Sequence, residues 1–445
     1  MSNQEPGTKN KEHPNSHMRI WVVNPFDQLP NETDVPLRYW TLCRMLAEQG
    51  HEVIWWSSDF SHLTKSKRAA CPPTDGFTVR LIETPPYAKN ISFARLRNHK
   101  AFAISFFREA MIGLKGEGLK VPDRIVLSLP PLDVAEYAFR IRDDLNQNTP
   151  NLNCQVIVDI QDAWPEAFYQ VLPKPLRQTL GPLLLYPLHR RARRTYGGAD
   201  KITAVGQTYV DLAKKYFARW LKGKIPPTHL CYLGADLHRF QNHHTLCTEK
   251  EKQQYTVTNK RPLQAIYMGS MGSSYDLETL IEVADRWKKE EILPWQIHFA
   301  GAGSQLKALK DTSQKRGLLN GRVFFHGYLE NSAIKQLLEE ADLGIVPNRP
   351  NSLVACPNKA CEYAAASLPI ISCLSGELEK LLQEWGVGIT YKESCIDSLY
   401  HAFEYYNSDI NRLAQHSSSA RIMATKLFNR DKSYRNLIQF ITEGA

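Results

Sequence analysis

The chain has no apolar run long enough to cross a bilayer. Its nearest case, Ala364–Leu374, falls short of the roughly 20 residues that a spanning helix needs. Residues 1–17 are polar, so we expect a disordered tail there rather than a signal peptide. These absences favour a cytoplasmic protein over an integral membrane protein.

Cysteine pairs are missing as well. The chain has nine cysteines, none of them in a C-x-x-C pair, and Cys356 and Cys361 have no His or Cys partner at the spacing of metal ligands. We therefore expect reduced thiols, as in a cytoplasmic protein. A metal role for these cysteines is not expected.

An acidic excess is also absent, since the formal net charge is +9. The basic side chains do not gather in one long tail, and their densest cluster is His189–Arg194, inside a predicted helix. No nucleic-acid-binding motif accompanies this cluster. The charge therefore favours an anionic membrane surface over nucleic acid as a partner.

Alternating strands and helices dominate what is present. The 445 residues are too many for one core, and apolar strands such as Arg19–Asn24 alternate with amphipathic helices. This pattern predicts an α/β fold with two Rossmann-like domains facing a central cleft. The predicted parts are a disordered tail at 1–17, an N-terminal domain at 18–222, a C-terminal domain at 223–420 and a final helical segment at 421–445.

The end of the chain, Ser408–Ala445, is predicted to be helical throughout. Its last part, Lys432–Ile441, places four large side chains on one helical face. These side chains are Tyr434, Leu437, Ile438 and Ile441.

The most informative stretch is Pro357–Pro369, PNKACEYAAASLP. A turn with Pro357 and Asn358 opens a helix of small residues, whose first turns carry Lys359 and Glu362. Free amides at a helix N-terminus suit a diphosphate, and a lysine adds a cation. The Glu362 carboxylate suits two adjacent ribose hydroxyls. An ordinary amphipathic helix explains these residue types equally well.

Two glycine-rich turns follow predicted strands. The first contains Gly269, Ser270 and Gly272, and the second, FAGAG, contains Gly301 and Gly303. Glycine lets the backbone approach a ligand closely, and a strand-to-helix turn of this kind binds phosphate. Many βα turns carry glycine without binding a ligand, so this signal is weaker than the first.

Carboxylates and an arginine follow strands of the first half. Asp162 and Glu166 lie in DIQDAWPE, where a catalytic or acceptor-binding carboxylate would face the cleft. Capping of a helix by Asp162 before Pro165 is the alternative. Arg38 follows the loop after the first strand and could hold an acceptor phosphate, although a solvated arginine fits as well.

Together these stretches resemble retaining glycosyltransferases of family 4, which have the GT-B fold. The resemblance spans residues 18–445 and is most specific at PNKACEYAAASLPII. Its pattern is closest to the N-acetyl-L-fucosamine transferase branch of O-antigen and capsule assembly. Further marks are GHEV at Gly50–Val53, DAWPE at Asp162–Glu166, KITAVGQTYVDLAKKY at Lys201–Tyr216, LGADLHRF at Leu233–Phe240 and HGYL at His326–Leu329.

The resemblance implies transfer of a sugar, with retention, from a nucleotide-sugar donor to a glycan or lipid-linked acceptor. A UDP-sugar would bind the C-terminal domain and the acceptor the N-terminal domain, with the final helix crossing back to the latter. Glu362 matches the ribose-binding glutamate, Lys359 would face the diphosphate, and Leu329 would lie near the base. This fold type needs no bound metal, so no cofactor is expected.

Three positions depart from the family pattern. Val354 stands in place of the first glutamate of the E-x7-E motif, Ser270 in place of a frequent arginine, and Gln161 in place of a frequent histidine. Two other functions therefore stay open: a non-catalytic subunit that binds a nucleotide sugar, and a nucleotide-sugar epimerase.

Two segments have the composition of interfacial helices. Phe93–Arg108 mixes basic and aromatic residues, and Leu180–Arg194 joins an apolar run to the basic cluster. Both fit helices that bind anionic lipid. Packing of the apolar faces in the core explains the same composition equally well, so peripheral attachment at the inner face of the plasma membrane is a hypothesis.

Overall fold

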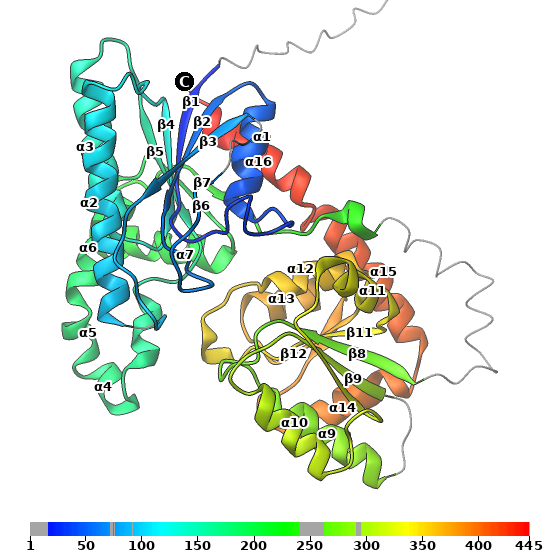
Figure 1. The fold of residues 1–445 in the computed structure, drawn as a ribbon. Helices are drawn as coiled ribbons and strands as arrows, with labels where there is room; N and C mark the ends of the chain where they lie inside the picture. Colours follow the sequence, from blue (N-terminus) through cyan, green and yellow to red (C-terminus); the bar gives the residue numbers. More distant parts are fainter. Residues whose placement is uncertain are drawn as a thin grey trace, which may run out of the picture. The chain divides into compact units, whose positions relative to one another are not determined.

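The computed structural model describes residues 17–71, 74, 76–90, 92–240, 262–290 and 295–444, and Figure 1 shows its elements. Apart from His17, the tail predicted at 1–17 lies outside the described residues. By contacts the chain divides into two compact units. The first unit is 1–127, 137–156 and 442–445, and the second is 128–136 and 157–441.

The first sheet has seven strands in the order β3-β2-β1-β4-β5-β6-β7. The neighbours β1 and β2, β1 and β4, β2 and β3, β5 and β6, and β6 and β7 run parallel. Every residue of β4 and of β6 is buried, as in parallel sheets covered on both faces. The strands are β1 (Arg19–Val23), β2 (Glu52–Ser58), β3 (Phe77–Ile82), β4 (Arg124–Leu129), β5 (Gln155–Ile160), β6 (Lys201–Ala204) and β7 (Thr228–Leu230).

Helices connect these strands, as the βα pattern predicts. The longest, α2 (Phe93–Lys115), begins after Ser92, whose hydroxyl accepts the Arg95 amide at 3.2 Å. The others are α1 (Arg38–Glu48), α3 (Asp133–Asn148), η1 (Glu166–Val171), α4 (Lys174–Gln178), α5 (Gly181–Leu184), α6 (Tyr186–Gly198), α7 (Gln207–Tyr216) and η2 (Phe217–Leu221).

The second sheet has six parallel strands in the order β10-β9-β8-β11-β12-β13. Its central strands are short, apolar and buried, which suits a sheet between two layers of helices. The strands are β8 (Leu263–Met268), β9 (Trp295–Ala300), β10 (Val323–Gly327), β11 (Leu343–Val346), β12 (Ile370–Ser372) and β13 (Gly388–Thr390).

Two apolar cores hold this sheet between its helices. One core joins Ile266 to Ala360 and Tyr363 of α12, and the other joins Ile297 to Phe403 of α14. Figure 1 shows α11, α12 and α15 on one side of the sheet and α9, α10 and α14 on the other. The helices are α9 (Glu278–Lys289), α10 (Leu306–Lys315), α11 (Asn331–Glu340), η4 (Pro350–Ser352), α12 (Asn358–Ala365), α13 (Glu377–Trp385) and α14 (Ile396–Asn407).

The end of the chain forms two helices, so the prediction of one continuous helix from Ser408 was wrong. α15 (Asn411–Lys426) and α16 (Arg430–Thr442) are separated at Leu427–Asn429. There the Ala235 amide donates to the Phe428 carbonyl at 2.8 Å, and the Arg430 amide donates to the Ala235 carbonyl at 3.2 Å. The predicted apolar face of α16 is confirmed, because Tyr434, Leu437, Ile438 and Ile441 are all buried.

The last helix contacts the first sheet. The Lys201 ammonium, at the start of β6, donates to the Phe440 carbonyl at 2.7 Å. His229 of β7 stacks on the Phe440 ring with centroids 5.2 Å apart. The predicted return of the C-terminal helix is therefore confirmed. The domain limits stay a prediction, although β7 follows the predicted boundary at 222–223 and still pairs with β6.

Among the described helices, none combines the length and apolar character needed to cross a membrane.

Candidate functional site

The start of α12 is built by Pro357, which is the N-cap residue and adopts an extended backbone. Proline has no amide hydrogen to donate to a preceding helical turn, so it suits a position at the start of a helix. The first helical residue, Asn358, is exposed, whereas Lys359 is 9% exposed. The amides of this first turn have no intrahelical partners, so they are available to an anion.

Lys359 is the unusual member of this turn. Its ammonium group is inaccessible to solvent and has no hydrogen-bond partner among the described residues. It lies 4.2 Å from the ring centre of Tyr267 and 4.3 Å from that of Tyr275. Burial lowers the pKa of Lys359 to about 7, because the charged form loses its hydration. The two rings offset part of that cost by cation–π attraction.

The glycine turn after β8 lies against this lysine. A side chain on Gly269 would approach the Lys359 ammonium to 3.3 Å, so a larger residue would crowd the lysine. The Tyr267 hydroxyl donates to the Ser270 carbonyl, which ties the turn to the ring beneath Lys359. The structure thus brings Gly269 and Lys359 together, as predicted for one site.

The second glycine turn packs on the first. The Met271 amide donates to the Ala302 carbonyl at 2.8 Å. Gly301 and Gly303 both have positive φ angles, and a side chain on Gly301 would overlap the Gly269 carbonyl. Contact between the two turns explains these glycines before any ligand is considered.

Other predicted donor residues differ in surroundings. Ser270 is exposed, and a side chain on Gly272 would meet only the Ser270 hydroxyl, at 4.0 Å, so the fold does not require glycine there. Leu329 is half-buried and packs against the core beneath α12.

Glu362 has arginine partners that the sequence patterns did not reveal. Its Oε2 lies 3.2 Å from Arg239 Nη1, and its Oε1 lies 3.9 Å from Arg430 Nη2. Burial raises the pKa of Glu362, and the two guanidinium groups offset part of that rise. A carboxylate oxygen has two lone pairs, so Glu362 can still accept hydroxyl donors beside Arg239.

Asp162 lies beside the loop that precedes α12. It is exposed, and its carboxylate raises the pKa of Tyr209, as burial of that tyrosine does more strongly. The Tyr209 hydroxyl donates to the Leu353 carbonyl at 3.1 Å and accepts the Ala355 amide at 3.3 Å. Tyr209 therefore holds the loop around Val354 next to Asp162. The 3-10 helix η1 has Pro165 as its N-cap, so the capping alternative for Asp162 is not supported.

Glu377, at the start of α13, holds the same region from another side. Its carboxylate accepts the amides of Gln207 and Thr208, both at 2.7 Å, and the Tyr232 hydroxyl at 2.6 Å. It thus satisfies the first amides of α7, which would otherwise be unpaired. No residue pattern in the sequence had pointed to Glu377.

Glu166 does not present a free carboxylate. Its Oε1 accepts the Tyr216 hydroxyl at 3.0 Å, and that hydroxyl also contacts His189 Nδ1 at 2.6 Å. Burial raises the pKa of Glu166. The structure therefore places Glu166 in a buried network with α6 and α7, where a structural role accounts for its contacts.

Arg38 is the first residue of α1 and is 4% exposed. The alternative of a solvated arginine is therefore wrong. Metal ligands do not cluster: in the part of the chain that the structure describes, no group of three His, Cys, Asp or Glu could hold a metal ion.

The residues predicted to bind the donor lie within a stretch of the sequence that matches a protein-family model. Residues 248–423 match the family model for glycosyl transferases group 1. The matched segment covers less than half of the chain. It contains Lys359, Glu362 and both glycine turns. No curated protein sequence matches the chain.

Solved structures show the fold of the whole chain. It resembles sucrose-phosphate synthase from Thermosynechococcus elongatus at a TM-score of 0.67 and 15% identity, with 95% of this chain and 98% of that chain covered. It resembles HepE from Anabaena, in complex with UDP and glucose, at 0.61 and 14%, with 96% and 100% covered. WaaG, a glycosyltransferase involved in lipopolysaccharide biosynthesis, follows at 0.62 and 12%, with 96% and 100% covered. The predicted GT-B architecture, with two Rossmann-like domains, is confirmed.

The residues of this region that no sequence pattern revealed are either aromatic or far along the chain from their partners. Tyr267 and Tyr275 bracket the glycine turn in YMGSMGSSY, so their spacing was a usable signal. Arg239 lies within LGADLHRF, but its partner Glu362 is 123 positions away, and no local pattern connects them.

Proposed function

We propose that the chain transfers a sugar from a UDP-sugar to a glycan or lipid-linked acceptor, with retention of the anomeric configuration. The observation that carries this proposal is the buried Lys359 ammonium, which has no hydrogen-bond partner among the described residues. It lies at a glycine turn, in the segment that matches the family model for glycosyl transferases group 1. A buried cation without a counterion costs stability, so its presence favours a role in binding an anion.

In this proposal the donor diphosphate meets Lys359 and the amides after Pro357 and Asn358. The ribose hydroxyls donate to Glu362, and the base lies near Leu329. The turns with Gly269, Ser270, Gly272, Gly301 and Gly303 line the sugar and phosphate. The HepE structure in complex with UDP and glucose supports a UDP-linked donor.

The chemical step needs a cation where negative charge develops. The bond between the sugar C1 and the diphosphate oxygen breaks, and a bond from an acceptor hydroxyl oxygen to C1 forms on the same face. The hydroxyl proton passes to the departing phosphate oxygen. Lys359 stabilises the departing diphosphate, and Asp162 orients the acceptor hydroxyl. No metal is required by this scheme.

The decisive experiment is a screen of thermal shifts with UDP-, GDP-, dTDP- and ADP-sugars, followed by NMR of the product made from the best donor. A ligand that binds the folded state raises its melting temperature. We expect UDP-sugars, UDP-N-acetyl-L-fucosamine among them, to give the largest shift and a product with the donor's anomeric configuration. A shift without turnover would favour a non-catalytic subunit, and conversion of the UDP-sugar alone would favour an epimerase.

We place the reaction in bacterial surface polysaccharide or glycoconjugate synthesis. The similarity to WaaG, from lipopolysaccharide biosynthesis, supports this setting. A lipid-linked acceptor would lie at a membrane surface, which makes peripheral attachment relevant.

We further propose that α5 and α6 attach to an anionic bilayer. Leu183 and Leu184 of α5 are 72% and 57% exposed, and basic residues of α6 follow within one turn of Tyr186. The other segment, Phe93–Arg108, buries Phe102 and Phe106 in the core, so its composition is explained by packing. Sedimentation with phosphatidylglycerol vesicles should require low salt and be lost in Leu183→Asp. Equal sedimentation of that variant and the unchanged protein would refute the attachment.

A further inference from the structure

A second cationic cluster lies in the first unit, where the loops follow β2 and β3. Lys65 stands in the loop after β2, and Arg95 lies in the first turn of α2. Asn90 joins them, because its side chain accepts from the Lys65 ammonium at 2.5 Å and its carbonyl accepts from Arg95 Nη1 at 2.8 Å. His62 lies between the two and contacts the Tyr87 hydroxyl.

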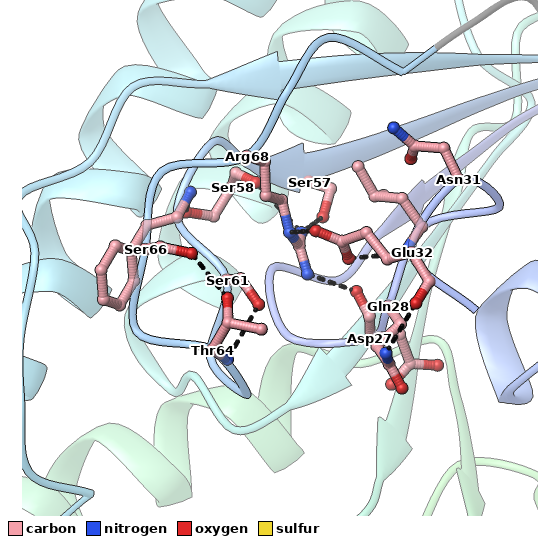
Figure 2. Close-up of polar contacts among 12 residues, drawn as sticks. Asp27, Gln28, Asn31, Glu32, Ser57, Ser58, Ser61, Thr64, Ser66 and Arg68 are labelled. Atoms are coloured by element: carbon pink, nitrogen blue, oxygen red, sulfur yellow. Dashed lines mark hydrogen bonds and ion pairs between the residues drawn. The ribbon is translucent and has the colours of Figure 1, made fainter. Parts of the chain in front are cut away.

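The loop that carries Lys65 is fixed by a buried arginine (Figure 2). Arg68 donates from Nη1 to the Ser57 hydroxyl at 2.9 Å and from Nη2 to the Asp27 carbonyl at 2.6 Å. Its Nε lies 3.1 Å from Glu32 Oε1. Arg68 therefore ties the loop after β2 to the loop after β1, and its charge is balanced by Glu32.

Lys65 itself donates hydrogen bonds to neutral groups. Besides Asn90, it donates to the His62 carbonyl at 2.6 Å. Burial and then the Arg95 charge lower the pKa of Lys65. Burial, Arg95 and Lys65 lower the pKa of His62 to about 4, so this histidine is neutral at pH 7. Two like charges are thus held close together at a partly exposed position.

The backbone and the rings around Lys65 add to this arrangement. Lys65 has a φ of 58°, in the left-handed region that a side chain disfavours. The Tyr87 ring centre lies 4.7 Å from the Lys65 ammonium, and the Phe26 ring centre lies 5.4 Å from the Arg95 guanidinium. The rings keep water from one side of each cation, which strengthens its attraction for an anion.

We infer that Lys65 and Arg95 form a binding site for a phosphate group carried by the acceptor. A phosphate accepts hydrogen bonds from both cations and relieves their mutual repulsion. The inference rests on the proposed function, because it names the chemical class of that function's acceptor: a phosphorylated glycan or a phosphate-linked lipid. Glu32, in the loop after β1, is engaged by Arg68.

The test measures phosphate binding while the donor site is filled. Inorganic phosphate is titrated into the full chain at saturating UDP, using the unchanged protein, Lys65→Gln, Lys65→Arg and the matched control Lys89→Gln. Lys89 is an exposed lysine nearby, so its variant carries the same charge change. We expect Lys65→Gln to bind phosphate at least about tenfold more weakly, as for a lost hydrogen bond to a charged group. Lys65→Arg should retain most of the affinity.

Two arms separate the possible sources of the phosphate. One uses a soluble phosphomonoester, glucose 1-phosphate, and the other uses phosphatidic acid vesicles with Leu183→Asp as background, so that the α5 contact is removed. Weaker binding by Lys65→Gln than by the control in either arm supports the site. The arm with the larger loss of binding identifies the source of the phosphate. Equal binding by Lys65→Gln and Lys89→Gln in both arms would overturn the inference.

The outcome for UDP distinguishes this inference from the proposed function. Lys65→Gln should keep the UDP affinity of the unchanged protein, and a fall in UDP affinity would assign Lys65 to the donor instead, against the inference. If UDP binds and sugar is transferred while the Lys65 variants behave as controls, only the acceptor phosphate is wrong. If UDP-sugars neither bind nor react, the proposed function itself fails.

Discussion

Two lysines show how differently the chain uses the same cation. Lys359, at the start of α12, is buried between two tyrosine rings and has no hydrogen-bond partner among the described residues. Lys65, in the first unit, is partly exposed and donates to two neutral oxygens. The pKa of Lys359 falls to about 7. At neutral pH a bound anion would therefore increase the fraction of Lys359 that is protonated. Burial and then the Arg95 charge lower the pKa of Lys65 as well, although its side chain stays partly exposed.

The largest expected effect is on stability. Because the pKa of Lys359 is lowered in the fold, the unfolded chain binds more protons between about pH 7 and pH 10.5. The lysine therefore destabilises the fold fully below pH 7, and stability returns as the pH rises toward 10.5. Lys359→Met should stabilise the protein at pH 6 by on the order of 4 kcal/mol, and by less at pH 9. Denaturant unfolding at both pH values measures this, with the exposed Lys380→Met as control. If Lys359→Met changed the free energy of unfolding equally at the two pH values, the lowered pKa of the buried Lys359 would be contradicted.

The substitution that is expected to raise stability, Lys359→Met, should lower the rate of catalysis. Lys359→Met removes the cation beside the departing diphosphate, so turnover with the best UDP-sugar should fall about 100- to 1,000-fold. Lys380→Met should retain full turnover. A stabilised variant that still turns over normally would remove Lys359 from the donor site while leaving the fold unchanged.

Glu362 provides a smaller test of the same region. Glu362→Ala should raise the donor KM about tenfold and reduce turnover, because the ribose loses an acceptor and Arg239 loses its partner. Steady-state kinetics measures both constants, with the exposed Glu384→Ala as control. Phosphate binding at Lys65 should not change, and an unchanged rate with every tested donor would reject the assignment of Glu362.

Proton uptake separates the two lysines directly. At pH 8 most Lys359 is neutral in the free protein, and a bound diphosphate favours the charged form. UDP binding should therefore take up a substantial part of one proton, which calorimetry in two buffers of different ionisation enthalpy reveals. The uptake should vanish in Lys359→Met and persist in Lys65→Gln. Uptake that survives in Lys359→Met would trace the proton to another group.

The smallest effect is expected at Lys65. Since its side chain is partly exposed and bonded to neutral groups, Lys65→Met should change the free energy of unfolding by no more than about 0.5 kcal/mol. Denaturant unfolding at pH 7 tests this. A loss of several kcal/mol would mean that Lys65 holds the loop together and would weaken its interpretation as a ligand site.

The sequence by itself determined the alternation of strands and helices, the start of α12 at Asn358 and the buried face of α16. These features follow from short-range patterns: apolar periodicity, a proline at a helix start and glycine after a strand. The same patterns placed the Gly269 turn and Lys359 at one edge of the sheet, because the carboxyl ends of parallel strands share one edge, and the structure shows the two close together.

Only the tertiary structure decided which charges are paired. It joined Glu362 to Arg239 across 123 positions and Glu377 to the Gln207 amide across 170 positions, and it engaged Glu166 with Tyr216 instead of leaving it free. It also separated Lys359 from water while leaving Lys65 partly hydrated. The physical reason is that burial and long-range contacts set the charge state of a side chain, and neither is encoded in the residues next to it along the chain.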